Sequence, residues 1–186
     1  MEHIISVTVE NKFGVLSRVA GLFSGRGFNI ESLTVGHTET DKISRMTIVV
    51  DGATTQVEQV IKQLYKLIDV IRVSDVSEDR TVDRELALIK VHCASASNRL
   101  EISNLADVFR GRVVDVATDA VIVEVTGTDE KVDSILVMLR PYGIKEMVRT
   151  GMISMVRGAQ ITARGSEARM LEAAGDRKST RLNSSH

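Results

Sequence analysis

The sequence is poor in the residues on which many binding and catalytic sites are built. Its 186 residues include no tryptophan, two tyrosines, four phenylalanines, one proline and one cysteine. A single cysteine, Cys93, excludes an internal disulfide and a metal site of paired cysteines, and it is consistent with a reducing compartment. RNA-recognition domains stack bases on aromatic residues of their sheet, so the scarcity of aromatic side chains argues against that class.

Long hydrophobic runs and an excess of one charge are also missing. No apolar run approaches the ~20 residues of a membrane-spanning helix, and no basic stretch precedes an apolar segment at the N-terminus. The sequence therefore predicts no membrane partner, no signal peptide and a cytoplasmic location. The net charge of −1 and the pI of about 6.4 supply no basic field, which predicts no nucleic-acid partner.

Motifs for catalysis and metal binding are absent as well. The four histidines show neither H-x-x-H nor H-E-x-x-H spacing, and no G-x-x-x-x-G-K-[ST] phosphate loop occurs. We therefore predict no catalytic residues and no metal site. With 43% hydrophobic and 26% charged residues, the composition is that of a globular protein rather than a disordered one.

The first half of the chain carries the pattern β-α-β-β-α-β. Alternating apolar residues predict strands, and apolar residues at helical spacing predict two helices. The second helix is expected to open at Thr55, which forms a capping box with Glu58. The expected elements are a strand at 3–10, a helix from 15 to the Gly25-Arg26-Gly27 breaker, a hairpin of strands at 28–38 and 42–52, a helix from 55, and a strand at 70–76.

The same order of elements returns after the polar stretch SEDRTVDRE, at 77–85. Four residues recur at an offset of 86, namely Val19, Phe23, Gly25 and Arg26 as Leu105, Phe109, Gly111 and Arg112. The predicted fold class is α+β, with two tandem βαββαβ ferredoxin-like domains. The expected divisions are a first domain at 1–77, a second at 80–158, a polar extension at 159–175, and a non-native tail at 176–186 that looks like translated sequencing adapter, so that the natural C-terminus is missing.

The corner between the first strand and the first helix reads NKFG, and it has two interpretations. Asn11 and Gly14 are ordinary turn residues. Alternatively, the free N–H groups of the helix start bind a carboxylate, and Gly14 lets the ligand approach the backbone. Asn11 can donate to the carboxylate and accept from the ammonium group of a zwitterion without adding net charge. A second amide, Asn29, reaches this corner either within one chain or from a partner subunit. Phe13 and Val15 supply apolar surface that suits an aliphatic amino acid.

The segments NKFGVLSRVAGLFSGRGFNIESLTVG, SRMTIVVDG and KQLYKLIDVIRVSD resemble the N-terminal ACT domain of the small subunit of acetolactate synthase, also called acetohydroxyacid synthase. The resemblance runs through residues 3–77. RELALIKV, FRGRVVDV and GIKEMVRTG are similar to the C-terminal domain of the same family, over residues 80–158.

This resemblance implies a regulatory subunit that is not itself an enzyme. It implies a catalytic large subunit as partner, which condenses two pyruvate molecules to acetolactate and CO2. That partner carries thiamine diphosphate, Mg and FAD, whereas this chain holds no cofactor. The small subunit is expected to activate that partner and to confer feedback inhibition by valine or another branched-chain amino acid. The effector is expected between the ACT domains of a homodimer, bound by Asn11, Gly14, Val15, Asn29 and Ile30.

At the offset of 86, Ser97, Leu100 and Asp115 replace Asn11, Gly14 and Asn29. We therefore predict effector binding in the first half only. Phe13 is larger than the small or polar residue expected at its position, and its size is expected to change which aliphatic side chain of an effector fits. Two rival functions are a free-standing ACT-domain amino-acid sensor without a catalytic partner and a small hydrolase of the acylphosphatase type. The hydrolase ranks last because it needs an arginine at the first corner, where Lys12 is the only cation expected.

Overall fold

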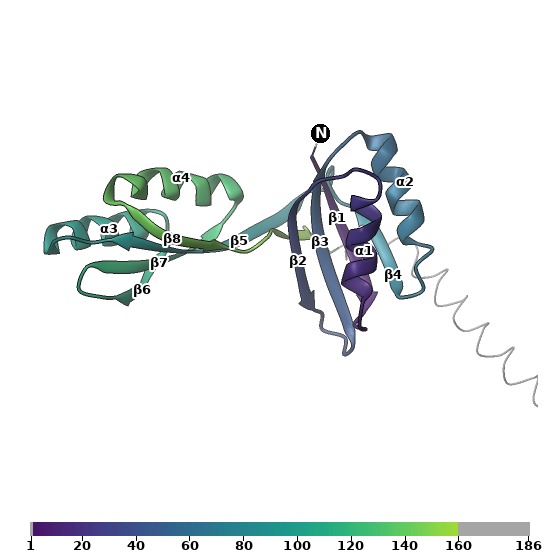
Figure 1. The fold of residues 1–186 in the computed structure, drawn as a ribbon, viewed down its shortest axis with the longest axis horizontal. Coiled ribbons are helices and arrows are strands. Elements are labelled where there is room, and N and C mark those ends of the chain that lie inside the picture. The colour runs from purple at the N-terminus through teal and green to yellow at the C-terminus, as the bar shows by residue number, and fades with distance from the viewer. Residues whose placement is uncertain (1, 160–186) are drawn as a thin grey trace, which may run out of the picture.

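The computed structural model describes residues 2–159, which form two α+β domains with one antiparallel sheet each (Figure 1). The predicted fold class is confirmed. The first sheet has the strand order β2-β3-β1-β4, and two helices lie on one of its faces. The elements of the first domain are β1 (Glu2–Glu10), α1 (Val15–Ser24), β2 (Ile30–His37), β3 (Ile43–Asp51), α2 (Thr54–Leu64) and β4 (Val70–Asp75).

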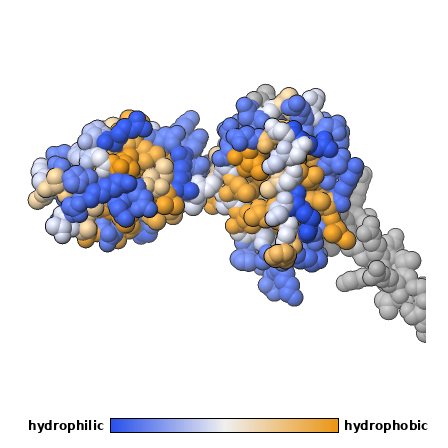
Figure 2. All heavy atoms as spheres, in the orientation of Figure 1, coloured by the Kyte–Doolittle hydropathy of each residue, from blue (hydrophilic) through white to orange (hydrophobic). Residues whose placement is uncertain are grey.

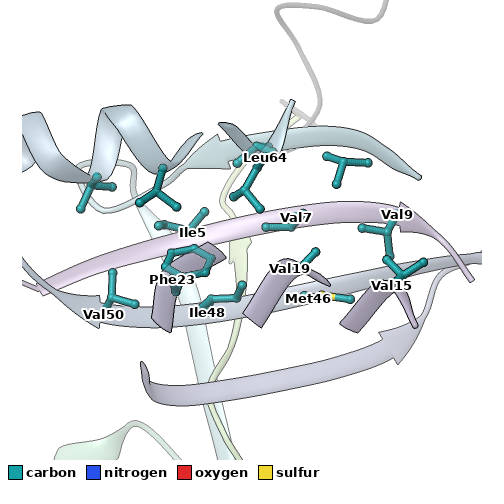
Figure 3. Close-up of a cluster of buried hydrophobic side chains, with 14 residues drawn as sticks. Ile5, Val7, Val9, Val15, Val19, Phe23, Met46, Ile48, Val50 and Leu64 are labelled. Carbon is teal, nitrogen blue, oxygen red and sulfur yellow. The ribbon is translucent and has the colours of Figure 1, made fainter. Parts of the chain in front are cut away.

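The core of the first domain follows from the alternation of β1. Ile5, Val7 and Val9 point to the helix-covered face and are almost completely buried. They meet one stripe of α1 and the inner face of β3, as Figure 3 shows. Phe23, at the end of α1, packs edge-on against Phe28 with ring centroids 6.2 Å apart. The other core residues labelled in Figure 3 are Val15, Val19, Met46, Ile48, Val50 and Leu64.

The second domain repeats the arrangement. Its main sheet has the order β6-β7-β5-β8, and its core gathers apolar residues of this sheet and of two helices. Helix α4 ends at Leu139, and a short 3₁₀ turn that contains Pro141 follows it. The elements are β5 (Thr81–His92), α3 (Ala96–Val108), β6 (Arg112–Val116), β7 (Ala120–Gly127), α4 (Asp129–Leu139), η1 (Arg140–Tyr142), β8 (Ile144–Arg149) and β9 (Ile153–Val156).

Two local predictions are wrong. Helix α2 begins at Thr54 with Ala53 as its N-cap, so Thr55 and Glu58 do not form the expected capping box. Instead, the Ala53 N–H donates to Gln56 Oε1 at 3.4 Å. The second difference is β9, which pairs with Thr81–Arg84 at the start of β5. The charged residues of that stretch hide its strand character, so the sequence shows only a polar stretch at 77–85.

The stretch between β8 and β9 contacts the first domain. The Met152 N–H donates to Ser32 Oγ at 2.8 Å. Gly151 lies so close to β2 that a Cβ at this position would be 2.5 Å from Thr34 Oγ1 and 2.7 Å from the Leu33 carbonyl oxygen. Any larger residue would have to push the two domains apart at this point.

Within residues 2–159, no helix is long and apolar enough to cross a membrane. Apolar and charged side chains are interspersed on the face shown in Figure 2. All but the first residue of the predicted polar extension, and the whole predicted tail, lie outside the described residues.

Candidate functional site

The NKFG corner is a four-residue connection whose backbone is tied to the neighbouring strand. The Asn11 N–H donates to the Lys42 carbonyl oxygen, just before β3, at 2.7 Å. The Lys12 N–H donates back to the Glu10 carbonyl at 2.9 Å, which makes a tight turn at the end of β1. The Asn11 side chain is exposed. The corner therefore has a fixed backbone and presents an amide to solvent.

Gly14 is the N-cap of α1 and has a φ of +80°. Residues other than glycine rarely adopt this left-handed backbone conformation. A Cβ at this position would also lie 3.2 Å from Arg18 Nη1. The backbone thus requires a glycine here whether or not a ligand binds.

The start of α1 leaves hydrogen-bond donors open. No side chain caps this helix. The Val15 N–H makes a long hydrogen bond of 3.4 Å to the Lys12 carbonyl oxygen. Within residues 2–159, the N–H groups of Leu16 and Ser17 have no backbone acceptor. Such unpaired donors at a helix start suit a carboxylate, as the ligand interpretation of the sequence requires.

The two apolar residues of the corner differ in what they can offer a ligand. Phe13 is completely exposed, with a relative accessibility of 103%. Val15 is 3% exposed and belongs to the core. Phe13 can therefore supply apolar surface with its ring, whereas Val15 can contact a ligand only through its backbone.

A cluster of two cations and two carboxylates lies beside the corner, and sequence reasoning missed half of it. Arg18 Nη2 donates to Asp69 Oδ2 in a short contact, and Lys12 pairs closely with Glu10 and lies 3.8 Å from Asp69 Oδ1. The hydrogen bond to Glu10 raises the pKa of Lys12. The prediction that Lys12 is the only cation here is wrong. Arg18 is one helical turn away and Asp69 is 51 residues further on, so no local pattern links them.

Asn29 and Ile30 lie at the other end of the sheet. Strands β1 and β2 are both antiparallel to β3, so they run in the same direction. Ile30, at the start of β2, pairs with Val50, and Val50 pairs with His3 at the start of β1. Asn11 follows the end of β1, eight residues after His3, which corresponds to about 25 Å of strand.

The structure therefore brings Asn11, Gly14 and Val15 together and places Asn29 and Ile30 far from them. Of the two routes predicted for Asn29, the one within a single chain is excluded. Only a second copy can bring Asn29 and Ile30 to this corner.

A cleft of about 440 Å³ lies between the two domains rather than at the corner. Its lining includes Glu2, Glu31 and Asp129 together with Arg149. Burial, the charge of Asp129 and the charge of Glu31, in that order, raise the pKa of Glu2. No group of acidic, histidine or cysteine residues within residues 2–159 is arranged to hold a metal ion.

Two family models match the chain, and together they span most of the described residues. Residues 5–72 match the AHAS small subunit-like ACT domain. Residues 84–158 match the small subunit of acetolactate synthase. The chain belongs to the acetolactate synthase small subunit family.

Individual relatives agree with this membership over nearly their whole length. The probable acetolactate synthase small subunit of Archaeoglobus fulgidus is 60% identical over 158 residues, which are 85% of this chain and 98% of the relative. The acetolactate synthase small subunit of Bacillus subtilis is 50% identical over 161 residues, 86% of this chain and 93% of the relative. The predicted family, and the prediction of a small subunit rather than an enzyme on its own, are confirmed.

A solved structure of the family has the same architecture. The crystal structure of the acetolactate synthase small subunit from Thermotoga maritima superposes with a TM-score of 0.78 at 41% identity, and the match covers 86% of this chain and 99% of that one.

Proposed function

We propose that the chain binds a branched-chain amino acid, valine first, between the first domains of two copies and thereby regulates a catalytic large subunit. The observation that carries the proposal is the separation of the predicted site residues into two half-sites. One half-site is the corner with Asn11 and Gly14, and the other is the start of β2 with Asn29 and Ile30.

The topology of the first sheet supplies a way to join the half-sites. Strand β2 is at the edge of its sheet within the described residues and pairs only with β3. Edge strands present unpaired backbone groups on which a second strand can pair. If two β2 strands pair antiparallel about a two-fold axis, the start of one lies next to the end of the other. Because β1 and β2 run in the same direction, Asn29 of the second copy is then beside the corner, and the symmetry creates two identical sites.

The chemistry of the joined site fits an amino-acid zwitterion, whose net charge is zero. The open N–H groups of Leu16 and Ser17 and the amide of Asn11 donate to the carboxylate of the effector. The amide oxygens of Asn11 and of Asn29 from the second copy accept from its ammonium group. Ile30 and the exposed ring of Phe13 contact the aliphatic side chain. The two cations and two carboxylates beside the corner add no net charge, which favours a neutral amino acid over an anion.

Membership of this family supports a catalytic large subunit as the partner. In the proposed complex, the large subunit holds thiamine diphosphate, Mg and FAD and condenses two pyruvate molecules to acetolactate and CO2 in the cytoplasm. This chain activates it and conveys feedback inhibition. An effector can shift activity only if it binds one arrangement of the dimer more tightly than another, and contacts across the two-fold axis provide that difference.

Titration calorimetry of the full chain with valine, leucine, isoleucine and serine tests the effector site. We expect binding of at least one branched-chain amino acid, no binding of serine, and loss of binding in Asn11→Ala. If wild-type protein binds none of them, the corner is a turn and the effector proposal fails.

Mixing the chain with a catalytic large subunit of the family tests the partner. We expect a stable complex, higher acetolactate production and inhibition by the amino acid that binds in calorimetry. Effector binding without a complex or any change of activity would instead favour the free-standing sensor.

A further inference from the structure

Asp69 connects two parts of the corner that are far from it in sequence. Its backbone carbonyl accepts from the Glu10 N–H at 2.8 Å, at the last residue of β1. Its carboxylate accepts from Arg18 Nη2, in the first turns of α1. The Asp69 side chain is 8% exposed. One nearly buried residue therefore holds the strand before the corner and the helix after it.

Arg18 is placed against the backbone of the corner. Its Nη1 would lie 3.2 Å from a Cβ of Gly14, and its backbone N–H donates to the Gly14 carbonyl at 3.1 Å. The guanidinium group thus lies beside Gly14, in the direction in which a side chain would project. It lies beside the residue whose left-handed conformation turns the chain into α1.

The position of Asp69 indicates on which side this contact lies. Asp69 immediately precedes β4, whereas the proposed dimer contact uses β2. These strands are the two opposite edges of the first sheet. The guanidinium is therefore held from the β4 side, and the face of the corner toward the second copy is left open.

We propose that Arg18, held by Asp69, is a positioning residue for the effector. The pair fixes the turn at Gly14 and so aims the Leu16 and Ser17 N–H groups and the Asn11 amide at the ligand. This inference rests on the proposed function, because it assigns a role at the same effector site. Stability alone is a weak reason for the pair, because half-exposed ion pairs add little to folding and Arg18 is 46% exposed.

Calorimetry with valine on the full chain tests the inference in four variants. Arg18→Met keeps the apolar stem and removes the guanidinium, and it should weaken valine binding about tenfold, as the loss of a residue that orients the binding groups of a site commonly does. Arg18→Lys should restore part of the loss. Asp69→Asn should weaken binding similarly, and the double variant Arg18→Met/Asp69→Asn should be no weaker than the worse single variant, because the two residues act as one unit.

Arg26→Met is the matched control, because Arg26 is an exposed arginine just beyond the end of α1. It should bind valine like the wild type. Melting temperatures of all variants show whether a loss of binding merely follows a loss of folding. Valine binding by Arg18→Met within twofold of the wild type, or a loss that Arg18→Lys does not reduce at all, would overturn the positioning role.

Amide hydrogen exchange gives a readout that needs no effector. The amide of residue 18, which donates to the Gly14 carbonyl, and the Asn11 amide, which donates to the Lys42 carbonyl, should exchange faster in Arg18→Met than in the wild type, with no change in the second domain. If wild-type protein binds no valine but this difference is seen, the effector proposal fails and the role of Arg18 in shaping the corner stands. If exchange is unchanged, Arg18 does not position the corner.

Discussion

The two strand-to-helix corners of the molecule occupy the same place in two similar domains, yet they are built differently. In the second domain, Ser95 caps α3 by accepting from the Asn98 N–H at 3.2 Å. The Cys93 N–H is bound to the Asp119 carbonyl at 2.8 Å, and its side chain is buried. In the first domain, Gly14 leaves α1 without a side-chain cap. Within the described residues, the second corner satisfies the N–H of the third helical residue, Asn98, with a side chain, whereas the first leaves the N–H of its third helical residue, Ser17, open.

The difference also corrects the residue correspondence expected from the offset of 86. Three residues separate β5 from α3, whereas four separate β1 from α1, and α3 has 13 residues where α1 has 10. Ser97 and Leu100 therefore lie inside α3 rather than at the corner. The helix ends, Ser24 and Val108, differ by 84, and the starts of the next strands, Ile30 and Arg112, differ by 82, so the offset of 86 does not hold there either. The confinement of effector binding to the first half stays a prediction.

The largest expected effect comes from closing the open corner with a side chain. Gly14→Ala forces a Cβ into a left-handed backbone and against Arg18, which should lower the free energy of unfolding by about 1–2 kcal/mol. Valine binding should fall more than tenfold because the donors are no longer aimed. Calorimetry and thermal unfolding measure the two effects.

Gly21→Ala is the matched control for this change. Gly21 lies within α1, and a Cβ there would meet no atom within 4 Å. Alanine should stabilise the helix by up to about 1 kcal/mol and leave valine binding unchanged. Equal loss of binding in both variants would show that the corner is not special.

Asn11→Ala should separate function from stability. The Asn11 side chain is exposed, and the anchor of this residue to Lys42 is a backbone bond that alanine retains. The free energy of unfolding should change by less than about 0.5 kcal/mol, as for other surface substitutions. Valine binding should fall at least tenfold in calorimetry. A variant that binds valine normally would remove Asn11 from the site.

Ser95→Ala should have the reverse profile. Losing the cap of α3 should cost about 1 kcal/mol of stability in denaturant unfolding. Valine binding should stay at the wild-type level, because effector binding is predicted in the first half only. Weakened binding in this variant would contradict the division of roles between the corners.

The smallest effect concerns the cleft between the domains. The pKa of Glu2 is raised above its ordinary value of 4.5, so the folded protein holds this proton more tightly than the unfolded chain does. Its contribution to stability therefore falls as the pH rises through that pKa to neutrality. Glu2→Gln should raise the melting temperature slightly at pH 7 and lose this advantage at and below about pH 4. An equal shift at both pH values would exclude charge repulsion as the cause.

Much of the fold and part of the site can be predicted from the sequence. Alternation along β1 and the helical spacing of Val15, Val19 and Phe23 predict their elements because each has one clearly buried side. Strand β9 is too short for such a pattern. The amide and glycine of the corner could be recognised locally. The contact of Arg18 with Asp69 could not, because it depends on how α1 packs beside the start of β4.

The distance between the two half-sites can be predicted only when the order of the strands in the sheet is known, in addition to the order of the elements along the chain. The sequence alone left Asn29 free to reach the corner within one chain or from a second copy. The parallel direction of β1 and β2, each paired antiparallel to β3, decides between these routes. An effector site that joins Asn11 with Asn29 therefore requires two copies.

Mixing two inactive variants tests this claim most directly. Each site takes Asn11 from one copy and Asn29 from the other. A mixed dimer of one Asn11→Ala copy and one Asn29→Ala copy therefore has one site without either amide and one site with both. Neither variant alone should bind valine. After dissociation and reassociation at equal amounts, calorimetry should recover about a quarter of the wild-type sites, with wild-type affinity. Recovery of no sites in a mixture shown to contain mixed dimers would contradict a site shared between two copies.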